Sequence, residues 1–213
     1  MKKKGYDFSL LPMDIGRVVC ACFPLVFRLK RVTPTGERYK ARVRGGAIVA
    51  ANHTSFLDPL TVAVTFWYRR MFFLVGEIVM QGRLRSWLLK GIGAIKIDRH
   101  QADLEAIKRS VSVLRGGHML SIFPQGGIDR ENGVDQIKSG AVLIALQAGV
   151  PIVPMHIFPR EKWWKRRVIC IGNAVDPKAL CAKRMPSTAD IAAITERLAE
   201  ELKNCTKLME EHV

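Results

Sequence analysis

Residues 47–58, Ala-Ile-Val-Ala-Ala-Asn-His-Thr-Ser-Phe-Leu-Asp, form the stretch that decides the fold. The apolar run at residues 47–51 is typical of a buried strand, and a second apolar segment follows after a few polar residues. We therefore expect a strand that ends near Asn52 and a helix that begins soon afterwards. Ser55 and Asp58, three residues apart, have the form of a capping box at the start of that helix.

His53 and Asp58 are the candidate catalytic residues of this stretch. A histidine at a strand edge can act as a general base, and a nearby carboxylate can fix its tautomer and orientation. On one continuous helix, positions five apart point about 140° away from each other, at roughly 100° per residue. The two side chains can therefore meet only if His53 lies in the turn and Asp58 in the first helical turn. The alternative is a capping box alone, with His53 an ordinary loop residue.

Short strand-like runs alternate with helical runs through the rest of the chain. Strands are expected at 48–50, 71–75, 95–97, 119–123, 152–153 and 168–171, and helices at 56–67, 79–90, 104–114, 137–147 and 187–209. This alternation predicts an α/β domain with a mostly parallel sheet flanked by helices. In such sheets ligands bind beyond the carboxyl ends of strands, where His53, Arg99 and Gln125 are expected.

The N-terminal segment, residues 8–29, is expected to be a distinct helical element with a wide apolar face. Basic residues flank it on both sides. These features are typical of an amphipathic helix that lies in a lipid interface, although the helix could instead dock on the protein's own core. Pro24 should kink it or split it in two. We assign residues 1–31 to a membrane anchor and residues 32–213 to the α/β domain, and no apolar run approaches the about 20 residues needed to span a bilayer.

The charge balance indicates an acidic partner. The chain has 34 Lys and Arg against 19 Asp and Glu, a net charge of +15. Nucleic acid, anionic lipid and a phosphorylated substrate would each fit. Residues 163–167, Trp-Trp-Lys-Arg-Arg, mix aromatic and cationic side chains as either a nucleic-acid surface or a membrane interface does. The five cysteines show neither metal-ligand nor disulfide spacing, which favours reduced thiols on the cytosolic side.

Two further segments place ligand-binding groups after strands. In residues 93–99 a guanidinium, that of Arg99, follows a strand and could grip a phosphate. In residues 123–127, Phe-Pro-Gln-Gly-Gly, two glycines would let backbone N–H groups approach a ligand closely. The plain alternatives are a surface ion pair of Asp98 with Arg99 and a simple turn at the end of a strand.

Taken in order, these segments resemble the glycerolipid acyltransferase family, whose members acylate glycerol 3-phosphate or 1-acylglycerol 3-phosphate. The resemblance covers about residues 45–160. The matching segments are 52–58 (the family's histidine-x4-aspartate motif), 93–99, 123–126, 138–141 and 150–154.

The resemblance implies direct transfer of a fatty acyl group from acyl carrier protein or coenzyme A to 1-acylglycerol 3-phosphate, giving phosphatidic acid. His53 would be the general base and Asp58 would orient it. Arg99 would bind the acceptor phosphate, and the backbone at Gly126 and Gly127 would hold the oxyanion. Neither a metal nor another cofactor is implied. We expect a peripheral protein on the cytoplasmic face of an anionic membrane, with no nucleic-acid partner.

The chain departs from the family pattern around its third segment. Gln125 stands in place of the usual glutamate, and Gly127 and Ile128 replace threonine and arginine. Arg130 could supply the missing cation, and Lys138 begins the family's lysine-x-glycine stretch. Val75 stands where a lysine is common. Three alternatives therefore stay open: another lipid alcohol as acceptor, a non-catalytic protein that binds anionic membranes, or a nucleic-acid-binding protein.

Overall fold

The computed structural model describes residues 11–98, 103–124, 137–160, 165–181 and 186–210. These residues form one seven-stranded sheet with the order β1-β7-β6-β2-β5-β3-β4. The strands are β1 (Leu29–Val32), β2 (Ala47–Ala51), β3 (Met71–Gly76), β4 (Ala94–Ile97), β5 (Met119–Ile122), β6 (Ile152–Ile157) and β7 (Arg167–Ile171). Neighbouring strands run parallel except for β6 and β7, which are antiparallel. The expected α/β fold with a mostly parallel sheet is confirmed.

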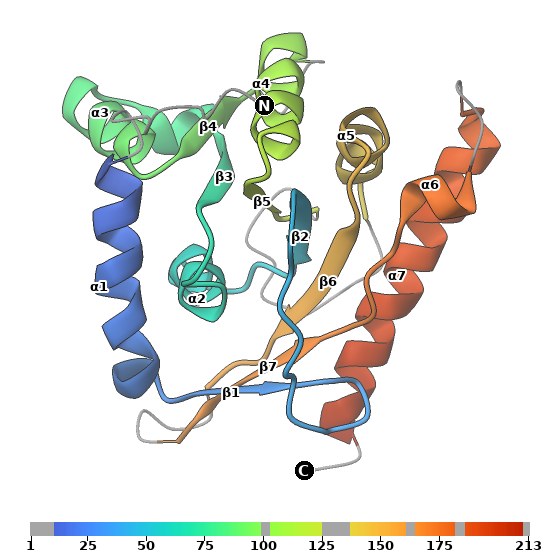
Figure 1. Cartoon of the computed structure of the whole chain (residues 1–213), viewed down its shortest axis with the longest axis horizontal. Helices are drawn as coiled ribbons and strands as arrows, with labels where there is room; N and C mark the ends of the chain where they lie inside the picture. The colour runs from blue at the N-terminus through green and yellow to red at the C-terminus, as the bar shows by residue number, and fades with distance from the viewer. Residues whose placement is uncertain (1–10, 99–102, 125–136, 161–164, 182–185, 211–213) are drawn as a thin grey trace, which may run out of the picture.

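Helices cover both faces of this sheet (Figure 1). Helices α4 (Leu104–Arg115), α5 (Gly140–Ala148) and α7 (Thr188–Glu210) pack on one face, and α2 (Asp58–Thr65) packs on the other. Helix α1 (Leu11–Phe27) lies outside α2 and packs against it. The short elements are the 3-10 helix η2 (Glu77–Met80) and the helices α3 (Arg83–Gly91) and α6 (Pro177–Leu180).

The expected helix at 79–90 is two separate elements, so that prediction was wrong in its bounds. Between η2 and α3 the chain passes through Gly82, whose φ of 92° is open to glycine but strained for other residues. At the other end of the chain the prediction was correct. Helix α7 is present where a helix was expected at 187–209, and it begins with a capping box: Ser187 N donates to Asp190 Oδ2 at 2.8 Å, and Asp190 N donates to Ser187 Oγ at 3.2 Å.

The N-terminal segment forms helix α1, which continues through Pro24 without a break. The expected split in two therefore does not occur. Met13 is buried in the core, and Asp14 accepts hydrogen bonds from both Arg70 Nε (2.9 Å) and Arg70 Nη2 (2.6 Å). The same helix exposes Leu11, Ile15, Val18 and Val19 to the outside. Within the described part of the chain, none of the helices has the length and apolar character of a membrane span.

Strand β1 follows α1 directly and was not predicted. It pairs in parallel with β7, and Val32 is buried. Residues 29–31, which we assigned to the anchor, therefore belong to the sheet, and β1 crosses the expected boundary between residues 31 and 32.

Candidate active site

The turn that follows β2 is fixed to β6 by the side chain of Asn52. Its Nδ2 donates to the carbonyl oxygen of Ile157 at 3.1 Å, and Ile157 N donates to its Oδ1 at 2.7 Å. The amide nitrogen and the amide oxygen of this buried side chain therefore each have a hydrogen-bond partner. The arrangement holds the following residue, His53, at the carboxyl edge of the sheet.

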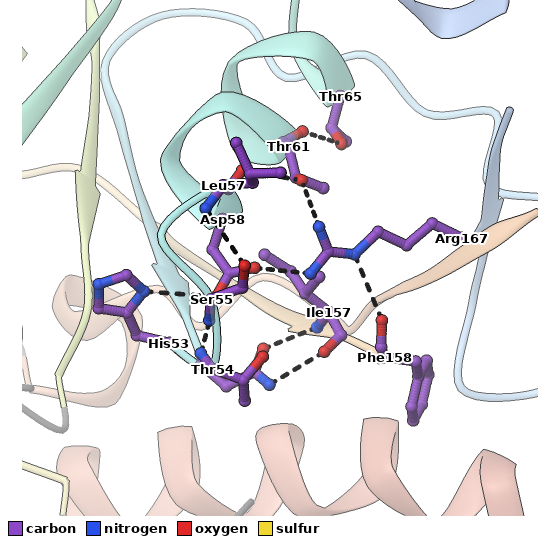
Figure 2. A network of polar contacts seen from close by, with 11 residues as sticks. His53, Thr54, Ser55, Leu57, Asp58, Thr61, Thr65, Ile157, Phe158 and Arg167 are labelled. Carbon is purple, nitrogen blue, oxygen red and sulfur yellow. Dashed lines mark hydrogen bonds and ion pairs between the residues drawn. The ribbon is translucent and has the colours of Figure 1, made fainter. Parts of the chain in front are cut away.

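The carboxylate of Asp58 joins the turn to the start of α2 (Figure 2). Asp58 is fully buried and is the first residue of that helix. Its Oδ2 accepts hydrogen bonds from Thr54 N at 2.7 Å and from Ser55 N at 2.6 Å, and it lies 3.3 Å from His53 Nδ1. The expected geometry, with the histidine in the turn and the aspartate in the first helical turn, is confirmed.

Only half of the expected capping box is present at this helix. Asp58 accepts the N–H of Ser55, but Ser55 Oγ accepts from Leu57 N at 3.3 Å and not from Asp58 N. Leu57 occupies the cap position itself. The same carboxylate oxygen therefore satisfies backbone donors of the turn and contacts the histidine. Asp58 is thus both the partner of His53 and an acceptor for backbone N–H groups of the turn, so the pair and a partial cap occur together.

Arg167, the first residue of β7, completes the site and was not predicted. Its Nη2 donates to Asp58 Oδ1 at 2.7 Å, its Nη1 to Thr61 Oγ1 at 3.0 Å, and its Nε to the carbonyl oxygen of Phe158 at 3.4 Å. The side chain is buried, so its assignment to a cationic surface at residues 163–167 was wrong. Because β7 runs antiparallel to β6, the start of β7 lies at the edge where β6 ends.

These contacts determine the charge of Asp58. Burial alone raises the pKa of the carboxyl, but the hydrogen bond from His53, the N–H groups of Ser55 and Thr54, and the charge of Arg167 together bring the pKa below its ordinary value. Asp58 is therefore ionised at neutral pH and can only accept hydrogen bonds. Because an ionised carboxylate can only accept, His53 Nδ1 is the donor in this contact, and Nε2 is the ring nitrogen that does not face Asp58.

An apolar cavity of about 620 Å³ adjoins His53. Its walls come from α1, α2, β3 and α3, and include Met13, Leu60, Phe73 and Leu89. Phe123, just after β5, also lines the cavity, and its ring stacks on the His53 ring with centroids 4.3 Å apart. A cavity of this size and lining fits a hydrocarbon chain. His53, the candidate general base, therefore lies at the wall of an apolar cavity.

The remaining predicted residues fall into two groups. Lys138 is described and exposed, and its backbone N–H donates to the carbonyl oxygen of Pro124, in the third segment, at 3.2 Å. Val75 lines the cavity, so the residue in place of the usual lysine adds to the apolar wall. The other predicted ligand-binding residues lie outside the described residues: Arg99, Gln125, Gly126, Gly127 and Arg130.

A family model described as acyltransferase matches residues 31–158, more than half of the chain. This chain belongs to the acyltransferase family. The acyltransferase is 26% identical over 163 residues to the 1-acyl-sn-glycerol-3-phosphate acyltransferase of Bacillus subtilis strain 168, a match that covers 74% of this chain and 80% of that protein. It is 30% identical over 109 residues to the protein of the same name from Streptococcus pneumoniae, covering 51% of this chain and 40% of that protein.

A solved structure supports the fold. The crystal structure of the 1-acyl-sn-glycerophosphate acyltransferase from Thermotoga maritima aligns with this acyltransferase at a TM-score of 0.60 and 18% identity. The alignment covers 94% of this chain and 79% of that one. The two chains therefore share their fold across nearly the whole of the acyltransferase.

Proposed function

We propose that this acyltransferase moves a fatty acyl group from an acyl thioester to the free hydroxyl of 1-acylglycerol 3-phosphate, giving phosphatidic acid. The observation that carries the proposal is the position of His53, which is oriented by a buried carboxylate and lies at the wall of an apolar cavity of about 620 Å³. The names of the Bacillus subtilis and Streptococcus pneumoniae relatives support this choice of acceptor.

The reaction follows from the orientation of the imidazole. Nε2 of His53 takes the proton of the acceptor hydroxyl while that oxygen attacks the thioester carbonyl carbon. The carbonyl electron pair moves onto oxygen, and it returns as the carbon–sulfur bond breaks. The imidazolium then gives its proton to the departing thiolate. Asp58 stabilises the imidazolium between these steps and keeps its Nδ1 proton in place. The acceptor itself is the nucleophile, so no enzyme serine takes part.

We assign the acyl chain of the donor to the apolar cavity, with its carbonyl carbon next to His53. The thiol carrier is acyl carrier protein or coenzyme A. Gly126 and Gly127 remain our candidates for the oxyanion, and Arg99, with Arg130 as a replacement for the missing arginine at 128, for the acceptor phosphate. Gln125 and Lys138 complete the proposed substrate-binding set.

We further propose that the enzyme works as a peripheral protein on the cytoplasmic face of a membrane. The acceptor and the product are lipids, and α1 exposes Ile15, Val18 and other apolar side chains within the anchor assigned to residues 1–31. A helix of this kind can lie in a bilayer interface without crossing it.

The proposal is tested by acyl transfer with the purified full-length chain. The donors are acyl carrier protein and coenzyme A thioesters, and the acceptors are 1-acylglycerol 3-phosphate, glycerol 3-phosphate and unphosphorylated 1-acylglycerol. We expect phosphatidic acid from the first acceptor and little product from the third. Equal use of the phosphorylated and unphosphorylated acceptors would contradict the assignment of the acceptor, and no product from any acceptor would contradict the proposed function.

A further inference from the structure

Helix α3 turns its apolar side chains outward. Leu84, Trp87 and Leu88 are 71%, 70% and 53% exposed, although their spacing places them on one face of the helix. The less exposed positions are Ser86, Leu89 and Gly91, and none of the residues of α3 is buried. A helix on the outside of a globular domain normally buries its apolar stripe and exposes its polar one. Helix α3 instead leaves both its apolar stripe and its cations exposed.

The exposed face of α3 continues onto its neighbours. Ile78 in η2 is 73% exposed, and Ile92, just after α3, is 51% exposed. The helix lies at the N-terminal end of α1 (Figure 1), where a β-carbon placed on Gly91 would lie 4.0 Å from the Cβ of Pro12. The C-terminal end of α3 therefore lies beside the N-terminal end of α1, and both helices expose apolar side chains. Several exposed apolar side chains close together mark a binding surface.

The charges of α3 indicate what binds there. Arg83, Arg85 and Lys90 are exposed, and the helix contains no acidic residue. A second copy of this chain would bring the same three cations against them and would be repelled. An anionic phospholipid surface offers negative headgroups to the cations and an apolar layer to the leucines, and tryptophan favours that boundary.

We propose that the docking surface, defined as Ile78, Leu84, Trp87 and Leu88 with the cations of α3, lies in the headgroup region of an anionic bilayer. The position of the cavity gives this docking a role. Leu89 and Ile92 line the cavity that His53 also lines, and so do Pro12 and Met13 of α1. The elements that enclose the cavity thus present their outer side to the lipid. The docking rests on the proposed function for its role, because an acceptor lipid held in that bilayer would lie next to the cavity. Binding of the docking surface to the bilayer does not itself require catalysis.

The experiment measures binding of the full-length chain to vesicles by sedimentation, with phosphatidylglycerol mixed into phosphatidylcholine. Leu84→Ser combined with Leu88→Ser should lower the partition coefficient about tenfold or more, because two large apolar side chains are no longer buried. The matched control is Leu143→Ser with Leu180→Ser, which removes two exposed leucines from α5 and α6, across the sheet from α1. The control should bind as the parent does.

A second comparison tests the cations of α3 with two variants whose net charge changes by the same amount. Arg83→Glu with Lys90→Glu should weaken binding to the anionic vesicles more than Lys178→Glu with Lys207→Glu, which changes the charge equally in α6 and α7. Equal effects of the two pairs would mean that overall charge, and not the docking surface, attracts the protein. This arm also keeps the test valid if the leucine variant lowers the melting temperature.

Three outcomes separate the docking from the proposed function and from other occupants. Loss of vesicle binding with unchanged acyl transfer in detergent supports the docking surface, since Leu84 and Leu88 do not line the cavity. Parent-like vesicle binding by the leucine variant overturns it. So does sedimentation velocity in which the parent is a dimer and the leucine variant a monomer, because a second copy would then be the occupant.

Discussion

Replacing Arg167 by methionine is expected to uncouple the buried carboxylate of Asp58 from its cation. Methionine keeps most of the apolar length of the side chain and cannot donate the 2.7 Å hydrogen bond to Oδ1. Removal of one partner from a buried ion pair costs about 3–5 kcal/mol. Because Oδ2 keeps its contacts with Thr54, Ser55 and His53, we expect about 3 kcal/mol. For a chain of this size that corresponds to a fall in Tm of roughly 6–12 °C.

The variant should also respond differently to acid. In the parent the pKa of Asp58 lies below its ordinary value of 3.8, so its contribution to stability is complete above pH 3.8 and is lost as the pH falls through the folded pKa. Without Arg167 the folded pKa rises. Part of the stabilisation is then missing at neutral pH, and the loss on acidification is smaller and ends at a higher pH than in the parent. Urea unfolding at a series of pH values measures both effects.

The catalytic consequence separates a positioning role for Arg167 from a purely structural one. A rotated Asp58 carboxylate would misplace His53, and misplacement of about 1 Å can lower kcat by up to about a hundredfold. The matched control is Arg197→Met, because Arg197 Nη2 donates to the buried carboxylate of Glu201 at 2.8 Å on α7, away from His53. That variant should lose stability and keep kcat. Parent-like kcat and pH profile in Arg167→Met, or equal losses of kcat in both variants, would refute the reasoning.

Four further outcomes are expected. His53→Ala should lower acyl transfer by about 10²–10⁴ with a smaller fall in Tm than Arg167→Met, and activity within a few-fold of the parent would exclude His53 as the base. Ile15→Ser with Val18→Ser on α1 should weaken vesicle binding and reduce activity on bilayer-held acceptor more than on detergent-dispersed acceptor; equal losses would argue against an anchor. Arg99→Ala should raise KM for the phosphorylated acceptor roughly ten- to a hundredfold and leave the donor KM unchanged, because a charge-assisted contact is worth about 1.5–3 kcal/mol. Burial lowers the pKa of His156 from 6.5 to about 4, so stability should fall by about 3 kcal/mol as the pH drops from 6.5 to 4 and the unfolded chain takes up the proton first. His156→Leu should flatten that part of the profile of unfolding free energy against pH, measured with urea. An unchanged slope would show that other groups cause the fall.

The parts of the fold that local patterns determine were predictable. Each strand expected from an apolar run is present, because such runs are buried wherever a parallel sheet is covered on both faces. Strand β1, Leu-Lys-Arg-Val, carries two cations and pairs with β7, which lies far along the chain. Its sequence alone gives no reason to expect a strand. The break between η2 and α3 depends on the backbone at Gly82, where the apolar periodicity continues without interruption.

The candidate site also has one part that local sequence patterns predicted and another that they did not. The contact between His53 and Asp58 lies within one turn, so spacing and a capping pattern were enough to predict it. The stacking of Phe123 on His53 requires β5 to lie beside β2 in the sheet. The ion pair of Arg167 requires in addition that β7 be antiparallel, which no local pattern in residues 163–171 indicates.

Asp58 connects the assembly of the sheet to the orientation of the base. One of its oxygens accepts the N–H groups of the turn and contacts His53, and the other accepts the guanidinium of Arg167 from β7. The full set of contacts around Asp58 therefore forms only when β2, α2 and β7 have come together. Substitutions at Asp58 or Arg167 should consequently lower stability and activity together. A substitution at His53 removes one of several contacts of Asp58, so it should lower activity far more than stability. The difference between those two patterns distinguishes the proposed proton-transfer residue from the residues proposed to hold it in position.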